Sequence, residues 1–137
     1  MVVSTRARVE GSGQDQPLIS VIDDDVSVRE ATTGLLKLMG FEVEAFSSAL
    51  DFLAFPRLDE IACVIADIHM PRMTGIELHD RLLASGHGIP TILITAYPNE
   101  DVRVRALANG VFGYLTKPFD EEALLGCIRA ALQAPSR

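Results

Sequence analysis

The sequence lacks any apolar run long enough to cross a membrane. Its longest apolar runs are strand-sized and interrupted by charge, whereas a transmembrane helix needs about 20 predominantly apolar residues. The N-terminus also has no apolar segment of the kind found in secretory signals. We therefore expect a cytoplasmic protein without a membrane partner.

Cysteine and positive charge are also scarce. The two cysteines, Cys63 and Cys127, lie far apart in a strand-like and a helix-like run, without metal-ligand spacing. Reduced core thiols are therefore favoured over a disulfide or a zinc site. Twelve basic against nineteen acidic residues give a net charge of -7 with no basic cluster, which argues against nucleic-acid binding by this domain.

The sequence contains enough hydrophobic residues to form the core of one domain. A chain of 137 residues that is 48% hydrophobic can bury a substantial core, but it is too short for two comfortable domains. Residues 1–16 have no apolar period and contain Gly11, Ser12 and Gly13, so we predict a disordered leader there. The folded domain is predicted to span 17–134, and 135–137 form a tail or the start of a linker.

One stretch organises the remainder of the chain. An unbroken apolar run at 61–66 ends abruptly in Asp67, and Pro71 and Gly75 then force a loop. This pattern predicts a buried strand with Asp67 at its carboxyl end. Asp67 is the candidate reactive group.

Strand-like and helix-like patterns alternate around this stretch. Strands are predicted at 18–22, 41–46, 61–67, 91–95 and 111–116. Helices are predicted at 28–39, from Ser47 or Ser48 to 55, at 76–84, from Asn99 to 109–110, and at 120–133. Asp25 or Ser27 is expected to cap the first of these helices.

Five strands and five helices with short connections predict a doubly wound α/β domain. Such connections permit only right-handed parallel crossovers, which give a five-stranded parallel sheet between two helical layers. Ligands of such sheets bind in the crevice at the carboxyl ends of the strands. The predicted strand ends carry Asp23, Asp24, Asp25, Asp67, Thr95 and Lys117.

These residue types favour phosphoryl transfer with a divalent cation. Two carboxylates about 5 Å apart repel by roughly 3 kcal/mol at an effective dielectric constant of about 20. Lys117 offsets only part of that repulsion, and the remaining negative charge suits Mg²⁺ or Mn²⁺. Asp67 would be the nucleophile, while the cation, Lys117 and the Thr95 hydroxyl would hold the phosphoryl oxygens.

Four blocks of the sequence resemble the signature blocks of the response-regulator receiver domain of two-component signal transduction. They lie at 21–25, 67–75, 94–96 and 114–119, in that order, each at a predicted strand end. The resemblance covers about residues 17–133 and is greatest to the nodulation and nitrogen-fixation regulator group. It implies a flavodoxin-like (βα)5 fold.

The resemblance also implies roles for individual residues. Asp67 would accept a phosphoryl group from a sensor histidine kinase or a phosphotransfer protein. Asp24 and Asp67 would bind Mg²⁺ directly, with the backbone carbonyl of His69 as a further ligand and Asp23 acting through water. Such a domain is a signalling phosphoacceptor that assists its own phosphorylation and dephosphorylation, and it is not an enzyme.

A second set of implied roles concerns the switch. Thr95 and Tyr114 would be the switch pair, and Lys117 would bind the phosphoryl group. The peptide bond from Lys117 to Pro118 would be cis, which aims the ammonium group into the site. Phosphorylation would then change the surface of the fourth helix, fifth strand and fifth helix, and would promote a homodimer.

Several alternatives stay open at this level. One alternative is a metal-dependent phosphohydrolase that uses Asp67 as its nucleophile and His69, two residues later, as the acid or base. No insertion is long enough for the cap of such an enzyme, and steady turnover of phosphate esters would indicate one. A pseudo-receiver that is never phosphorylated would be indicated by failure to bind Mg²⁺. The sequence fits either a stand-alone receiver or part of a longer regulator. Tyr97, two residues after Thr95, is expected to slow dephosphorylation through its bulk.

Overall fold

A computed structural model describes residues 16–134 of the chain. Five strands and five helices alternate along it, and a short 3-10 helix, η1 (Leu58–Glu60), precedes the third strand. In this part of the chain, no helix has the length and apolarity that crossing a membrane would require. The predicted leader, apart from Gln16, and the predicted tail lie outside the described residues, so the predicted domain limits stay a prediction.

The sheet is parallel throughout, with the strand order β2-β1-β3-β4-β5. Its strands are β1 (Leu18–Ile22), β2 (Glu42–Phe46), β3 (Ile61–Asp67), β4 (Thr91–Thr95) and β5 (Gly113–Thr116). This order confirms the predicted flavodoxin-like, doubly wound fold. The chain order reverses between β1 and β3, and a crevice at the carboxyl ends of these two strands is where such sheets place their ligands.

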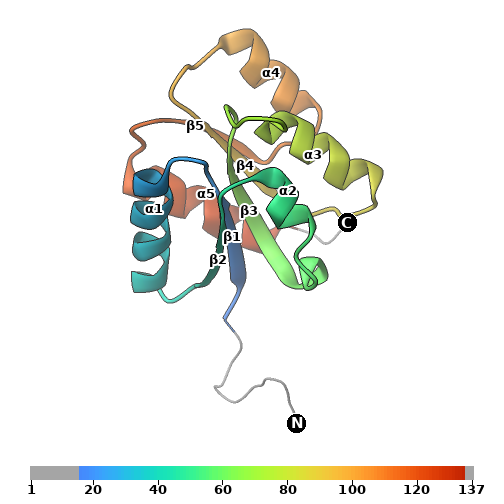
Figure 1. The fold of residues 1–137 in the computed structure, drawn as a ribbon. Coiled ribbons are helices and arrows are strands. Elements are labelled where there is room, and N and C mark those ends of the chain that lie inside the picture. The colour runs from blue at the N-terminus through green and yellow to red at the C-terminus, as the bar shows by residue number, and fades with distance from the viewer. Residues whose placement is uncertain (1–15, 135–137) are drawn as a thin grey trace.

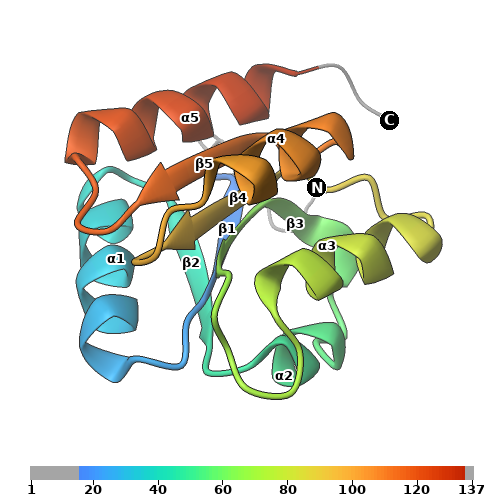
Figure 2. The same ribbon diagram turned by 90° about the horizontal axis from the view of Figure 1, so that it is seen from above.

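Helices cover both faces of the sheet and complete three layers. They are α1 (Val26–Leu38), α2 (Ala49–Leu53), α3 (Gly75–Ala84), α4 (Glu100–Ala108) and α5 (Glu121–Gln133). Figure 1 and Figure 2 show α1 and α5 on one side of the sheet and α2, α3 and α4 on the other. The crossover from β1 to β2 through α1 therefore passes over one face of the sheet, and the crossovers through α2, α3 and α4 pass over the other.

Side-chain caps fix where four of the helices begin. The Asp25 carboxylate accepts from the backbone N–H groups of Ser27 and Val28, so Asp25 rather than Ser27 caps α1. Ser48 caps α2 and Asn99 caps α4 in the same way. The cap of α3 is a reciprocal capping box between residues 74 and 77.

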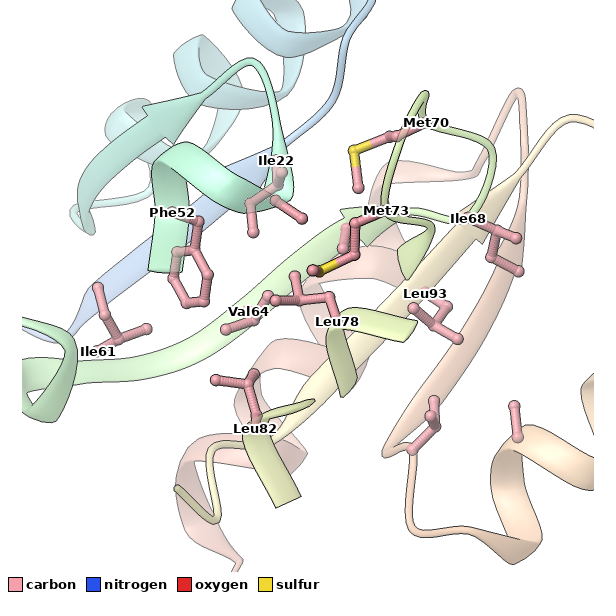
Figure 3. Close-up of a cluster of buried hydrophobic side chains, with 14 of the residues drawn as sticks. Ile22, Phe52, Ile61, Val64, Ile68, Met70, Met73, Leu78, Leu82 and Leu93 are labelled. Carbon is pink, nitrogen blue, oxygen red and sulfur yellow. The ribbon is translucent and has the colours of Figure 1, made fainter. Parts of the chain in front are cut away.

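Each face of the sheet has its own core. Figure 3 shows the core beneath α2 and α3, where Phe52, Val64, Leu78 and Leu82 meet and the loop after β3 adds two methionine side chains. The core on the other face joins α1 and α5 to the sheet. It includes Cys63, whose pKa is raised to about 12 by burial and by the nearby Cys127. Cys63 is buried in this core, and Cys127 is half-buried against it.

Several predicted boundaries were wrong. Helix α1 spans Val26–Leu38 instead of 28–39, α4 ends at Ala108 instead of 109–110, and α3 and α5 each begin one residue from the predicted position. Strands β2 and β5 begin one and two residues later than predicted, at Glu42 and Gly113. In both places a glycine with positive φ ends the preceding helix, and the next amide donates back to that helix: Phe41 to Leu36 at 3.1 Å and Val111 to Ala106 at 3.0 Å.

A further error concerns the end of the second helix. Helix α2 stops at Leu53 and not at Phe55, because the Phe55 amide donates to the carbonyl of Phe52 at 3.0 Å and tightens the last turn. The following η1 was not predicted, since its three residues carry no apolar period.

Candidate functional site

The carboxyl ends of β1 and β3 bring three carboxylates together. The strands pair in register, with Ile22 beside Ala66, so the acidic residues that follow each strand lie next to one another. Oxygens of Asp23, Asp24 and Asp67 all lie within 4.8 Å of one another. Asp23 and Asp67 are buried, with 4% and 7% of their surface exposed, while Asp24 faces solvent.

Lys117 supplies a cation to this cluster. Its Nζ lies 3.0 Å from Oδ2 of Asp23 and 3.4 Å from Oδ2 of Asp67. The backbone N–H of Lys117 donates to the carbonyl of Thr95 at 2.8 Å, and its peptide bond to Pro118 is cis. The lysine is thus held at the end of β5 with its side chain directed across β4 toward β1 and β3.

The pKa values of Asp67 and Lys117 are both raised by their surroundings in the cluster. Burial, and then the charge of Asp23, raise the pKa of Asp67, although Lys117 and the His69 amide partly oppose them. Burial alone would lower the pKa of Lys117, but its hydrogen bond and charge interactions with Asp23 and Asp67 raise it overall. The ammonium group is therefore held in its charged form among carboxylates that still repel one another.

This donor set fits a hard divalent cation. Three carboxylates lie close together and, in the described part of the chain, only one ammonium group, that of Lys117, contacts them, so negative charge exceeds positive charge within the cluster. Oxygen-only ligation suits Mg²⁺ or Mn²⁺ better than zinc. Among residues 16–134, this is the one group of three or more acidic, histidine or cysteine side chains spaced to share a metal ion.

The predicted switch residues meet at the segment between β4 and α4. Thr95 is fully buried, and its Oγ1 accepts from the backbone N–H of Tyr97 at 2.9 Å. The hydroxyl of Tyr114, on β5, accepts from the backbone N–H of Asn99 at 3.3 Å. Both hydroxyl groups therefore hold the segment that leads from β4 into α4.

Two exposed aromatic rings meet beside the cluster. The rings of His69 and Tyr97 pack edge to face, with their centroids 5.4 Å apart and their planes at 82°. The backbone N–H of His69 donates to Oδ1 of Asp67 at 3.3 Å, so this pair flanks the candidate nucleophile. Tyr97 is 73% exposed, which leaves its ring on the solvent side of the contact.

Sequence reasoning missed two residues that shape the site. The guanidinium group of Arg29 donates to the backbone carbonyl of Asp23 at 2.7 Å, although an arginine on a helix gives no sign of such a contact. A Cβ atom added at Gly75 would lie 2.6 Å from the backbone oxygen of Asp67. Gly75 belongs to one of the signature blocks, but its close approach to the backbone of Asp67 is visible only in the structure.

Comparisons with known proteins agree with this geometry. Residues 19–129 match the family model of the response regulator receiver domain. Response regulator protein TodT of Pseudomonas putida is 40% identical over 116 residues, which are 85% of this chain and 51% of TodT. Nodulation protein W of Bradyrhizobium diazoefficiens is 33% identical, again over 85% of this chain and 51% of that protein.

Solved structures give the same result. The structure of response regulator StyR matches with a TM-score of 0.80 at 44% identity, over 87% of this chain and 60% of that chain. The chain spans about half the length of the curated relatives named above.

Proposed function

The chain belongs to the response-regulator receiver domain family, and we propose that Asp67 is its phosphoacceptor. The match to Nodulation protein W agrees with the predicted subgroup. Receiver domains of two-component systems signal through phosphorylation of an aspartate, and they generally serve in signalling rather than in catalysis. The observation that carries the proposal is the position of Asp67: buried at the carboxyl end of β3, beside two further carboxylates and 3.4 Å from the Lys117 ammonium.

The proposed reaction moves one phosphoryl group between two side chains. An oxygen of Asp67 attacks the phosphorus of a phosphohistidine on a sensor histidine kinase or a phosphotransfer protein. A P–O bond forms, the P–N bond breaks, and the departing imidazole nitrogen takes a proton from solvent. Lys117 and the Thr95 hydroxyl then bind oxygens of the transferred group, which gains charge-assisted hydrogen bonds.

The acidic residues would hold the cation that this reaction needs. Asp24 and Asp67 would bind it directly, Asp23 would hold it through water, and the backbone carbonyl of His69 would be a further ligand. Mg²⁺ or Mn²⁺, when bound, supplies the charge neutralisation that a phosphoryl transfer between two anionic groups requires.

The proposal includes the consequences of phosphorylation. The phosphoryl group carries about two negative charges and replaces the single charge of the Asp67 carboxylate, so about one further negative charge appears beside Thr95. The two hydroxyl contacts between β4 and α4 would rearrange in response. The surface formed by α4, β5 and α5 would change and promote a homodimer in the cytoplasm. An unchanged mass in light scattering after activation would contradict the dimer alone.

Intact-protein mass after incubation with acetyl phosphate tests the central step. With Mg²⁺, the wild type is expected to gain one base-labile phosphoryl group, as an acyl phosphate would be. The gain should be absent without the cation and absent in Asp67→Asn, which keeps the shape of the side chain but not its nucleophilic charge. An unchanged mass with Mg²⁺ bound would indicate a pseudo-receiver, and steady phosphate release without an adduct would indicate a hydrolase.

Tyr97 is expected to lengthen the lifetime of the phosphoryl group. Its ring packs against His69 beside Asp67, so removing it opens a path for the attacking water. Tyr97→Ala should therefore lose the added mass severalfold faster than the wild type once the donor is removed, whereas Tyr97→Phe keeps the ring and should behave as the wild type does. Equal half-lives for the alanine variant and the wild type would count against this role.

A further inference from the structure

We propose that Arg29 is a positioning residue that sets the geometry of the acidic cluster through the main chain of Asp23. The inference rests on the cation-dependent function proposed above for the same site. Arg29 lies in the first turns of α1, which follows β1 directly (Figure 1). Its guanidinium group reaches back to the strand end and donates to the carbonyl oxygen of Asp23 at 2.7 Å. A charged donor at this distance makes one of the stronger hydrogen bonds of a protein.

The contact matters because of the peptide unit that it holds. The carbonyl of Asp23 and the amide of Asp24 belong to one planar group, so a bond to that carbonyl constrains the rotations on both sides of the plane. Those rotations determine the directions in which the side chains of Asp23 and Asp24 project from the backbone. Arg29 thereby acts on two of the three carboxylates that converge in the cluster.

The other polar groups of Asp23 are also engaged. Its amide donates to the carbonyl of Phe46 at 3.1 Å, and its Oδ1 accepts from the Asp25 amide at 2.9 Å. Its Oδ2 accepts from Lys117 at 3.0 Å. With the Arg29 bond, each hydrogen-bonding group of Asp23 has a protein partner. Hydrogen bonds therefore fix both the backbone and the side chain of Asp23. Arg29 supplies the bond to the backbone carbonyl.

A purely electrostatic role for Arg29 predicts the opposite effect on cation binding. A guanidinium charge near three carboxylates competes with a divalent cation, so its removal would tighten Mg²⁺ binding. A positioning role predicts weaker binding after its removal, because the ligands lose their preset geometry. The sign of the change therefore separates the two roles.

Isothermal titration with Mg²⁺ on the full chain tests the proposal, with the melting temperature measured in parallel. Arg29→Met removes the donor and the charge but keeps the aliphatic stem, and it is expected to weaken Mg²⁺ binding on the order of tenfold, as loss of a partner that orients metal ligands does. Arg29→Lys keeps a charged donor and should recover part of the affinity. Arg57→Ala, which removes an arginine just before η1, is the control and should bind as the wild type does.

Three results would overturn the inference. Binding by Arg29→Met that equals or exceeds the wild type would leave only an electrostatic role, and a lower melting temperature with unchanged affinity would leave only a structural one. A lysine variant no better than the methionine variant would also contradict it. If the wild type binds Mg²⁺ and Arg29→Met binds it more weakly, but acetyl phosphate gives no adduct, the proposed function fails while the role of Arg29 stands.

Discussion

Lys117→Ala is expected to bind Mg²⁺ more tightly than the wild type and to accept a phosphoryl group far more slowly. The ammonium group lies 3.0 and 3.4 Å from two of the carboxylates that the cation would use. A single and a double positive charge about 6 Å apart repel by about 1.4 kcal/mol at the dielectric constant of water, which is tenfold in affinity. Phosphoryl uptake should fall on the order of 100-fold, since a charged donor to the transferred group is lost.

Titration calorimetry and the rate of mass gain with acetyl phosphate give the two measurements. Lys37→Ala is a matched control, because Lys37 is the only other lysine and lies in the last turn of α1. It should change neither quantity. Weaker Mg²⁺ binding by Lys117→Ala would mean that the lysine organises the carboxylates more than it competes with the cation.

The same variant should show a larger dependence of stability on pH when Mg²⁺ is absent. Burial and Asp23 already raise the pKa of Asp67, so the folded state binds a proton at a higher pH than the unfolded state does. The free energy of unfolding therefore falls as the pH rises from the ordinary pKa of an aspartate toward that raised pKa, and it is greatest at acidic pH, where Asp67 is protonated in both states. Loss of the ammonium raises this pKa further, so the alanine variant should lose more stability between acidic and neutral pH than the wild type.

The strands with sharp ends in the apolar pattern could be predicted from local sequence alone. The bounds of β1, β3 and β4 were predicted without error, because an apolar run in each case meets a charged or turn-forming residue. The starts of β2 and β5 were wrong, because the amides of Phe41 and Val111 bond back to the preceding helix. Nothing in the apolar pattern distinguishes an amide that joins a sheet from one that closes a helix.

The site divides in the same way. Asp67 and Lys117 could be named from the sequence, since each ends a strand and the fold class brings strand ends together. The contact between Arg29 and Asp23, and the ring contact between His69 and Tyr97, depend on how side chains of different elements meet. The spacing of residues along the sequence does not indicate such contacts, so they could be identified only in the structure.

Gly75→Ala is expected to damage both stability and phosphorylation. The added Cβ would lie 2.6 Å from the backbone oxygen of Asp67 and 3.0 Å from Cδ2 of Leu93. The leucine side chain can turn aside, but the carbonyl belongs to the last residue of β3 and cannot move without moving Asp67. Overpacking of this kind costs about 1–3 kcal/mol. A displacement of the nucleophile near 1 Å would slow phosphoryl uptake on the order of 100-fold.

Chemical denaturation and the acetyl phosphate assay measure the two effects, and two other glycines serve as controls. Gly34 and Gly126 lie inside α1 and α5, and an added Cβ would meet no atom within 4 Å at either position. Alanine there should stabilise the protein by up to about 1 kcal/mol through helix propensity and leave phosphorylation unchanged. Adding Leu93→Ala to Gly75→Ala should not restore phosphorylation, because the clash with the Asp67 carbonyl remains. Full restoration by that second change would show that α3 is positioned against β4 and not against the residue that carries the phosphoryl group.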